Sequence, residues 1–255
     1  MPLEIVTLPC RTDNYAFLLH NNETGETALV DAPEAAPLEA ALKARGWGLD
    51  YILITHHHDD HIIAVATLRD QYGSTVIGAA ADAHRLPPLD QEVADGDVLK
   101  ILGEDMHVLD VSGHTIGHIA FHFPASNAAF TADSLMALGC GRLFEGTPEQ
   151  AWTSLCALAS LPEATIVYSG HEYTQANAKF ALTIEADNPA LIKRVADIDE
   201  ARAQGRPTVP SSLALERATN PFLRAAEPSV KAALDMTDQE PLAVFTEIRR
   251  RKDNF

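Results

Sequence analysis

The stretch Thr55-His56-His57-His58-Asp59-Asp60-His61 is the most informative part of this sequence. The short apolar run of residues 51–54 precedes it and predicts a strand. The spacing of apolar residues after it predicts a helix over residues 62–72. The histidines therefore lie where a strand ends and a helix begins.

This junction has the pattern of a metal site. His56 and His58 are two residues apart, so in an extended stretch their side chains point to the same side. Asp60 and His61 follow at the start of the helix and can face the same space from another direction. Imidazole and carboxylate ligands together suit zinc, manganese or iron.

Three later segments carry further candidate ligands, each just beyond a predicted strand. They are His114, Asp133 and His171. Loops at strand ends are where a rigid scaffold usually presents catalytic groups. We therefore expect these three side chains to complete the site.

The order of predicted elements indicates an α/β protein with a helical end. Strands separated by occasional helices fill the first part, which suggests sheets covered by helices. From residue 173 onward the pattern is helical, as in the spacing of Leu191, Val195 and Ile198. Residues 237–240 match a capping box before the last helix.

Composition and charge exclude several classes of partner. The 255 residues are 46% apolar and 22% charged, with a formal net charge of −17. An acidic surface repels nucleic acid and anionic lipid, so we expect neither as a partner. No apolar run approaches the length that a membrane span needs. An anionic substrate would require positive charge gathered locally.

The cysteines indicate a reducing compartment. Cys10, Cys140 and Cys156 are sparse, odd in number and without CxxC spacing, so they form no disulfide framework. The first ten residues lack the basic region of a signal peptide. We expect a cytoplasmic protein.

The sequence resembles the metallo-β-lactamase superfamily and, within it, the hydroxyacylglutathione hydrolase (glyoxalase II) family. The HxHxDH pattern is typical of the superfamily, and the other matching segments are typical of the family. The matching segments are Thr12-Asp13-Asn14-Tyr15, Leu29-Val30-Asp31, His56 to His61, His114, Asp133, residues 139–146 (GCGRLFEG), Gly170-His171-Glu172-Tyr173 and the C-terminal Arg-x-x-Lys-Asp.

This resemblance implies a fold and two domains with different roles. The expected fold is a four-layered αββα metallo-β-lactamase-like sandwich followed by a small all-helical domain. Residues 1–172 would form the catalytic domain, and residues 173–255 would form the helical substrate-binding domain.

The resemblance also implies two divalent metal ions, with zinc as the first choice and iron or manganese as alternatives. His56, His58 and His114 would hold the first ion, and Asp60, His61 and His171 the second. Asp133 and a hydroxide would bridge them, so that Asp60 and Asp133 act in catalysis through that hydroxide.

The implied reaction is hydrolysis of S-lactoylglutathione to glutathione and a 2-hydroxy acid, as in methylglyoxal detoxification. A catalytic metal can lower the pKa of bound water from 15.7 to roughly 7, so no serine or cysteine nucleophile is needed. We find no convincing GxSxG motif in the chain.

Binding the two carboxylates of glutathione requires cations. Arg249 and Lys252 are three residues apart, hence on one face of the last helix. Cations in a last helical turn are also favoured by the helix dipole alone. The resemblance implies that Arg249 and Lys252, with Arg142 and Tyr173, contact glutathione.

We expect the protein to be a monomer.

Two kinds of alternative function remain open from the sequence. One is another enzyme on the same fold, such as a persulfide dioxygenase, a lactonase or a β-lactamase. The other is a metal-binding protein without turnover.

The chain also departs from the family pattern, with Ile63 and Ala64 where glycines are common and Phe144 where tyrosine is common.

Overall fold

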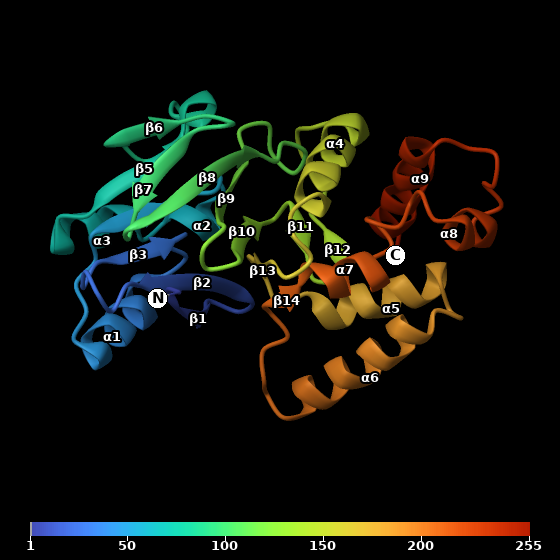
Figure 1. Cartoon of the computed structure of the whole chain (residues 1–255), viewed down its shortest axis with the longest axis horizontal. Helices are drawn as coiled ribbons and strands as arrows, with labels where there is room; N and C mark the ends of the chain where they lie inside the picture. The colour runs from blue at the N-terminus through green and yellow to red at the C-terminus, as the bar shows by residue number, and fades with distance from the viewer. Residues whose placement is uncertain (1) are drawn as a thin grey trace. The chain divides into compact units, whose positions relative to one another are not determined.

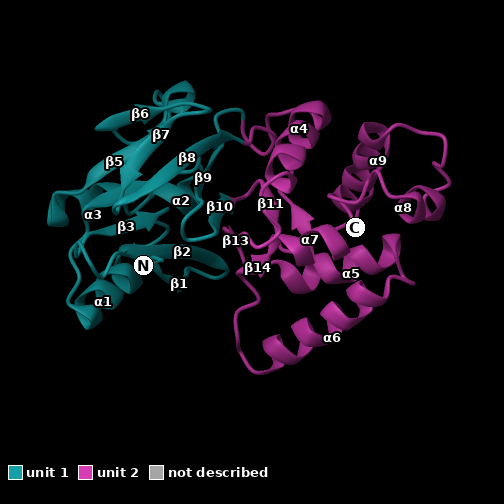
Figure 2. Ribbon diagram, viewed as in Figure 1, with its two compact units in different colours: residues 1–110, 116–131 teal, residues 111–115, 132–255 magenta. Residues whose placement is uncertain are grey.

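Residues 2–255 are described by a computed structural model, and the chain divides into two compact units (Figures 1 and 2). Unit 1 extends to Asp110 and also includes Ile116–Thr131. Unit 2 comprises Val111–Thr115 and Ala132–Phe255. The first unit is rich in strands and the second is rich in helices. The division at residues 172 and 173 stays a prediction.

Unit 1 contains a six-stranded mixed sheet. Its strands follow the order of the sequence, with antiparallel pairing from β1 to β3 and parallel pairing from β3 to β6. They are β1 (Glu4–Cys10), β2 (Asn14–His20), β3 (Thr27–Val30), β4 (Tyr51–Leu53), β5 (Thr75–Ala79) and β6 (Gln91–Val93).

Strand β2 is buried along its whole length because both of its faces are covered. Ala16 and Leu18 belong to the core cluster that also includes buried residues of the neighbouring helices. Phe17 points to the opposite side, where its ring lies 5.6 Å from that of Phe130. The alternation of two residues along a strand thus separates two hydrophobic layers within unit 1.

Two helices cover the first face of this sheet. Helix α1 (Ala35–Arg45) buries Leu38 and Leu42 in that core cluster, and α3 (Val65–Tyr72) buries Leu68 there. Each helix ends at a glycine with a positive φ, a conformation that glycine adopts without strain.

The helix predicted over residues 62–72 is interrupted, so that prediction is partly wrong. Helix α2 (Asp59–Ile62) is a single turn, and α3 begins only at Val65. Between them Ile63 and Ala64 form a turn, and the Ala64 N–H donates to the Ala32 carbonyl at 3.0 Å. This contact with the chain beyond β3 takes the backbone out of a continuous helix.

Four further strands of unit 1 form an antiparallel set, preceded in the chain by the 3₁₀ turn η1 (Ala80–Asp82). Phe130 of this set packs against Phe17 of β2, and the rings of Phe123 and Phe130 lie 6.0 Å apart. The strands are β7 (Val98–Ile101), β8 (Glu104–Asp110), β9 (Ile119–Phe123) and β10 (Ala128–Ala132).

Unit 2 contains short strands and most of the helices (Figure 2). After residue 173 it is almost entirely helical, which confirms that part of the sequence interpretation. The elements are β11 (Leu135–Met136), β12 (Gly139–Cys140), α4 (Pro148–Ala159), β13 (Ile166–Ser169), α5 (Thr174–Ile184), α6 (Pro189–Ala203), β14 (Ser211–Ser212), α7 (Leu213–Thr219), α8 (Pro228–Ala233) and α9 (Pro241–Asp253).

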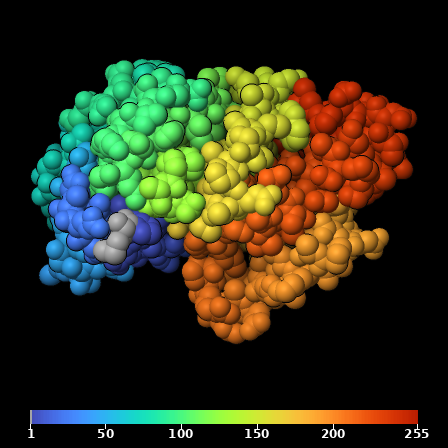
Figure 3. Space-filling view, in the orientation of Figure 1, coloured from blue at the N-terminus to red at the C-terminus, as the bar shows by residue number. Residues whose placement is uncertain are grey.

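Helices α5 and α6 pack against each other through small and branched apolar side chains. Ala178 and Ala181 of α5 meet Leu191 and Ile198 of α6, together with Leu138. The helical spacing of Leu191 and Ile198 in the sequence therefore predicted the buried face of α6. Its opposite face is exposed on the surface of unit 2, where Figure 3 shows it in orange.

The capping box predicted at residues 237–240 is wrong. The N-cap of α9 is Glu240, which has extended backbone angles and makes no capping hydrogen bond with its side chain. Pro241 occupies the first helical position, where its fixed φ suits the helix and its missing N–H costs nothing.

No helix among residues 2–255 is long and apolar enough to cross a membrane.

A buried ion pair connects three parts of unit 2. The Glu216 side chain is fully buried, and its carboxylate accepts hydrogen bonds from the Arg194 guanidinium and from the Leu138 backbone N–H. Arg194 also donates to the Thr219 hydroxyl at 2.7 Å. The pair thus joins α6, α7 and the turn between β11 and β12.

We expect Arg194→Met to lower the free energy of unfolding by about 3–5 kcal/mol, because it leaves the buried Glu216 charge without its cation. Urea titration followed by circular dichroism measures this change. Lys193→Met is the matched control. Lys193 is the adjacent residue and forms an exposed pair with Asp197, which should contribute no more than about 1 kcal/mol. Equal losses in the two variants would contradict this account.

Candidate metal centre

The histidine-rich segment of unit 1 forms a compact group of imidazoles between β4 and α2. His56 and His61 are fully buried, and Nε2 of His56 lies 3.1 Å from Nδ1 of His58. The ligand atoms of His56 and His61 lie within 4.8 Å of each other, as do those of Asp60 and His61. The four candidate ligands of this segment therefore come together as the sequence pattern predicted.

A buried carboxylate organises this group. Asp31, directly after β3, accepts the Nδ1 proton of His61 at 2.7 Å. It also accepts hydrogen bonds from the Thr55 hydroxyl at 2.8 Å and from the Thr55 N–H at 2.9 Å. An imidazole that donates from Nδ1 to a carboxylate carries its lone pair on Nε2, the form that binds a metal ion.

The same carboxylate acts on His56 through a hydroxyl group. The Thr55 hydroxyl donates to Asp31, so its oxygen accepts the Nδ1 proton of His56 at 3.0 Å. The His56 ring also stacks on His118, with ring centroids 4.6 Å apart and planes 11° apart. His56 and His61 thus present Nε2 for the same physical reason.

Asn14 holds the carboxylate of Asp60. Its amide group lies at the start of β2 and donates to Asp60 Oδ2 at 2.9 Å and to the Asp60 carbonyl at 3.0 Å. Asn14 is only 4% exposed, which keeps the amide in one orientation. A hollow of about 330 Å³ in unit 1 is lined by residues 11–14, Asp59 and Asp60.

Unit 2 supplies the other predicted ligands, which converge on Asp133. Asp133 follows β10 and is 5% exposed. Its Oδ2 atom lies 3.5 Å from Nε2 of His114 and 3.3 Å from Nε2 of His171. Nδ1 of His114 donates to the Arg142 carbonyl at 2.7 Å, which places the lone pair of this ring on Nε2 as well.

Two histidines near the predicted ligands, His57 and His118, have other partners in the chain. Nδ1 of His57 lies 2.9 Å from the carboxylate of the buried Asp82, which also pairs with Arg85. His118 is fully buried, and its Nδ1 lies 3.1 Å from the Ile119 carbonyl.

The predicted substrate-binding side chains differ in exposure. Arg142 is 58% exposed at its side chain, and Tyr173 is 38% exposed, with its ring stacked on His171 at 4.6 Å. Arg249 is only 6% exposed, and its guanidinium donates to the Cys140 carbonyl at 3.0 Å and to Asp253 at 2.8 Å. The role of these residues in binding a substrate stays a prediction.

Lys252 lies over an aromatic surface at the end of α9. Its ammonium nitrogen is 5.2 Å from the ring centroid of Phe180 and donates to the Ala176 carbonyl at 3.4 Å. Burial lowers the pKa of Lys252, and the neighbouring Arg249 charge lowers it further. A nearby carboxylate would favour its charged form.

Sequence reasoning missed the residues that orient the ligands. Asp31 and Asn14 entered only as parts of matching segments, without a role. A carboxylate directly after a buried strand was the available signal for Asp31, because β3 pairs in parallel with the strand that leads to the histidines. No signal in the sequence connected Asn14 to Asp60.

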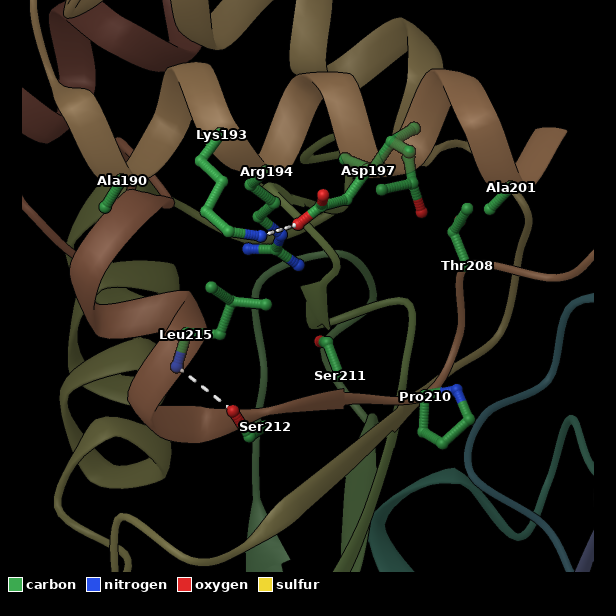
Figure 4. A pocket seen from close by; sticks show the side chains of 12 residues that line it. Ala190, Lys193, Arg194, Asp197, Ala201, Thr208, Pro210, Ser211, Ser212 and Leu215 are labelled. Carbon is green, nitrogen blue, oxygen red and sulfur yellow. Dashed lines mark hydrogen bonds and ion pairs between the residues drawn. The ribbon is translucent and has the colours of Figure 1, made fainter. Parts of the chain in front are cut away.

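A cavity beside α6 in unit 2 contains none of the predicted site residues. Its volume is about 510 Å³, and α6 and residues 208–215 provide most of its wall (Figure 4). Figure 4 shows that Lys193 and Asp197 pair with each other within this wall.

We expect Asp31→Asn to weaken metal affinity by about 10–100-fold, since partners of this kind orient the ligands and keep the proton on Nδ1. Chelator competition on the purified protein measures the affinity. Asp70→Asn is the control, because Asp70 is an exposed carboxylate on α3. Unchanged affinity in Asp31→Asn would show that the carboxylate does not prepare these histidines.

Two family models together cover nearly the whole chain. The model described as "Metallo-beta-lactamase superfamily" matches residues 12–171, and the model described as "Hydroxyacylglutathione hydrolase C-terminus" matches residues 172–255. A hydroxyacylglutathione hydrolase of Ruegeria pomeroyi is 64% identical over the full length of both chains. One from Rhizobium meliloti is 49% identical over 99% of both chains.

Solved structures show the same fold at lower identity. The BLEG-1 B3 metallo-β-lactamase superposes with a TM-score of 0.68 at 22% identity, covering 86% of this chain and 99% of its own. ETHE1 from Myxococcus xanthus superposes with a TM-score of 0.63 at 23% identity, covering 99% and 98%. TTHA1623, solved in a di-iron-bound form, has a TM-score of 0.63 at 26% identity, covering 86% and 100%.

These comparisons agree with the sheets, the covering helices and the helical C-terminal region, and so confirm the expected fold class. They also agree with a histidine and aspartate cluster suited to divalent metal ions. The chain belongs to the hydroxyacylglutathione hydrolase family and is a metal-dependent enzyme with the metallo-β-lactamase fold.

Proposed function

We propose that the protein hydrolyses S-2-hydroxyacylglutathione, with S-lactoylglutathione as the main substrate, to glutathione and a 2-hydroxy acid. This reaction would serve methylglyoxal detoxification. The observation that carries the proposal is the 64% identity over the whole length of a hydroxyacylglutathione hydrolase, including the C-terminal region specific to that family.

Seven side chains would hold two divalent metal ions. His56, His58 and His114 would bind one ion, and Asp60, His61 and His171 the other, with Asp133 bridging them. The donor chemistry fits such ions, because His56, His61 and His114 each direct Nδ1 to an oxygen acceptor and keep Nε2 for a ligand. Zinc suits these ligands, and iron or manganese would also be accepted.

When bound, the two ions supply hydroxide at neutral pH and polarise the thioester carbonyl. The work of the chain is to hold the ligands in one geometry. Asp31 and Thr55 keep the protons of two imidazoles on Nδ1, and Asn14 holds the Asp60 carboxylate. Burial raises the pKa of the Cys140 thiol, so it stays protonated and is unsuited to act as a nucleophile.

The glutathione moiety would bind to Arg142 and to two cations near the end of the chain, Arg249 and Lys252. Arg142, Arg249, Lys252 and the aromatic Tyr173 all belong to unit 2. The three cations would supply local positive charge in a protein whose net charge is −17. In this division residues 1–172 carry the catalytic metals and residues 173–255 bind most of the substrate.

Other features support a protein that acts alone on a small molecule in the cytoplasm. The three cysteines are free thiols, which suits a reducing compartment. The net charge of −17 disfavours nucleic acid and anionic membranes as partners. A monomer is the state we propose, and analytical ultracentrifugation would test it.

We expect Asp133→Ala to lose most of its bound metal and at least about 100-fold in activity, because it removes a metal ligand rather than one of the ligand's supports. Metal analysis and S-lactoylglutathione hydrolysis on the same sample measure both. Asp199→Ala is the control, since Asp199 is an exposed residue that pairs with Gln175. Full activity in metal-stripped wild-type protein would refute the mechanism.

We expect the double variant Arg142→Ala and Lys252→Ala to raise KM by at least about 100-fold, because it removes two charge-assisted contacts with carboxylates, each of which contributes roughly 1.5–3 kcal/mol. Metal content and kcat should stay close to those of the wild type. Arg250→Ala is the control, because Arg250 is exposed and pairs with Glu247 on its own helix. An unchanged KM would exclude both cations from the glutathione site.

A further inference from the structure

A short segment of unit 2 lies between two of the predicted metal ligands. The Arg142 carbonyl accepts the Nδ1 proton of His114 at 2.7 Å, and the Gly141 N–H donates to the Ser134 carbonyl at 3.1 Å. Residues 140–142 thus connect the loop that carries Asp133 to the ring of His114. Their position helps to decide how His114 is oriented.

Gly141 shows how closely this segment approaches both ligands. A β-carbon at this position would lie 1.9 Å from the Asp133 carbonyl oxygen and 2.9 Å from Nδ1 of His114. Real β-carbons essentially never come so close to another atom, so only glycine fits. The segment therefore cannot move toward these residues without displacing them.

The C-terminal helix holds the other end of this segment. The Arg249 guanidinium donates from Nη1 to the Cys140 carbonyl at 3.0 Å, across 109 positions of sequence. It lies 5.2 Å from the centroid of the Phe222 ring, and Nη2 donates to Asp253. Because β12 has only two residues, this contact is a large part of what fixes Cys140.

Arg249 differs from the other cations of the predicted glutathione site. The Arg142 side chain is 58% exposed, whereas the whole Arg249 residue is 6% exposed. Both of its terminal nitrogens already donate to oxygens of the chain itself. A guanidinium so placed is suited to fix the backbone, since its planar group holds several acceptors in one geometry.

We propose that Arg249 is a positioning residue for the metal ligand His114, acting through residues 140–142. Without its guanidinium, the buried Cys140 carbonyl loses a donor and the segment relaxes. The Arg142 carbonyl then no longer holds the His114 proton on Nδ1, and the metal site is weakened. This inference rests on the proposed function, because it assumes that His114 binds a metal ion.

The test uses the full-length chain loaded with zinc. Arg249→Met keeps the length of the side chain beside Phe222 but removes every donor, and Arg249→Lys keeps one donor group. We expect zinc affinity at one of the two sites to fall by about 10–100-fold in Arg249→Met and by about 3–10-fold in Arg249→Lys. Competition with a chelator measures both. Arg250→Ala on the same helix should match the wild type.

Cobalt(II)-substituted protein provides a second readout. A change in the geometry of His114 alters the visible absorption of bound cobalt, which a defect in glutathione binding alone would not do. We expect an altered spectrum in Arg249→Met, a spectrum closer to the wild type in Arg249→Lys, and no change in Arg250→Ala.

Wild-type zinc affinity and a wild-type cobalt spectrum in Arg249→Met, with a raised KM only, would overturn the proposal and leave Arg249 as a substrate contact alone. Near-ultraviolet circular dichroism checks the fold. If Arg249→Met does not fold, wild-type zinc affinity in Arg249→Lys overturns the proposal instead. Failure of wild-type protein to bind two zinc ions would refute the proposed function, which is a different outcome.

Discussion

The buried carboxylate of Asp31 is the constraint on which the histidine-rich junction depends. It accepts three hydrogen bonds, two from Thr55 and one from His61, at distances of 2.7–2.9 Å. A buried carboxylate is stable only when such donors are present, and these donors precede or belong to the metal-binding motif. The Asp31 carboxylate therefore holds together the end of β3, the end of β4 and the single turn of α2.

Unit 2 also uses buried charged side chains to hold its backbone in place. Glu216 and Arg249 are buried charges from α7 and α9, and both bind the backbone between residues 138 and 140. Asn220 adds hydrogen bonds to the carbonyls of Met136 and Gly139. The loop that follows Asp133 thus depends on side chains that lie about 80 to 110 positions later in the chain. The helical region accordingly holds the backbone that follows Asp133, in addition to the substrate-binding role proposed for it.

Such an arrangement suits a reaction in which the protein contributes no nucleophile of its own. Bound metal ions would activate water, and the chain would contribute geometry, the proton positions of the imidazoles and local positive charge. Cysteine thiols are present but buried or raised in pKa, so they do not compete with that chemistry. The proposed binding of an anionic substrate to Arg142 and the cations of α9 would place it on local positive charge in a protein with a net charge of −17.

The sequence by itself determined what depends on neighbouring residues. The period of two brought His56 and His58 to one side, the period of 3.6 identified the buried face of α6, and the motifs indicated the family. Only the tertiary structure decided the long-range partners. Asp31 reaches Thr55 because β3 and β4 pair in parallel, and Arg249 turns inward because Cys140 and Phe222 surround it. Local spacing carries no record of which distant acceptor a buried donor will meet, since that choice is made when the elements pack.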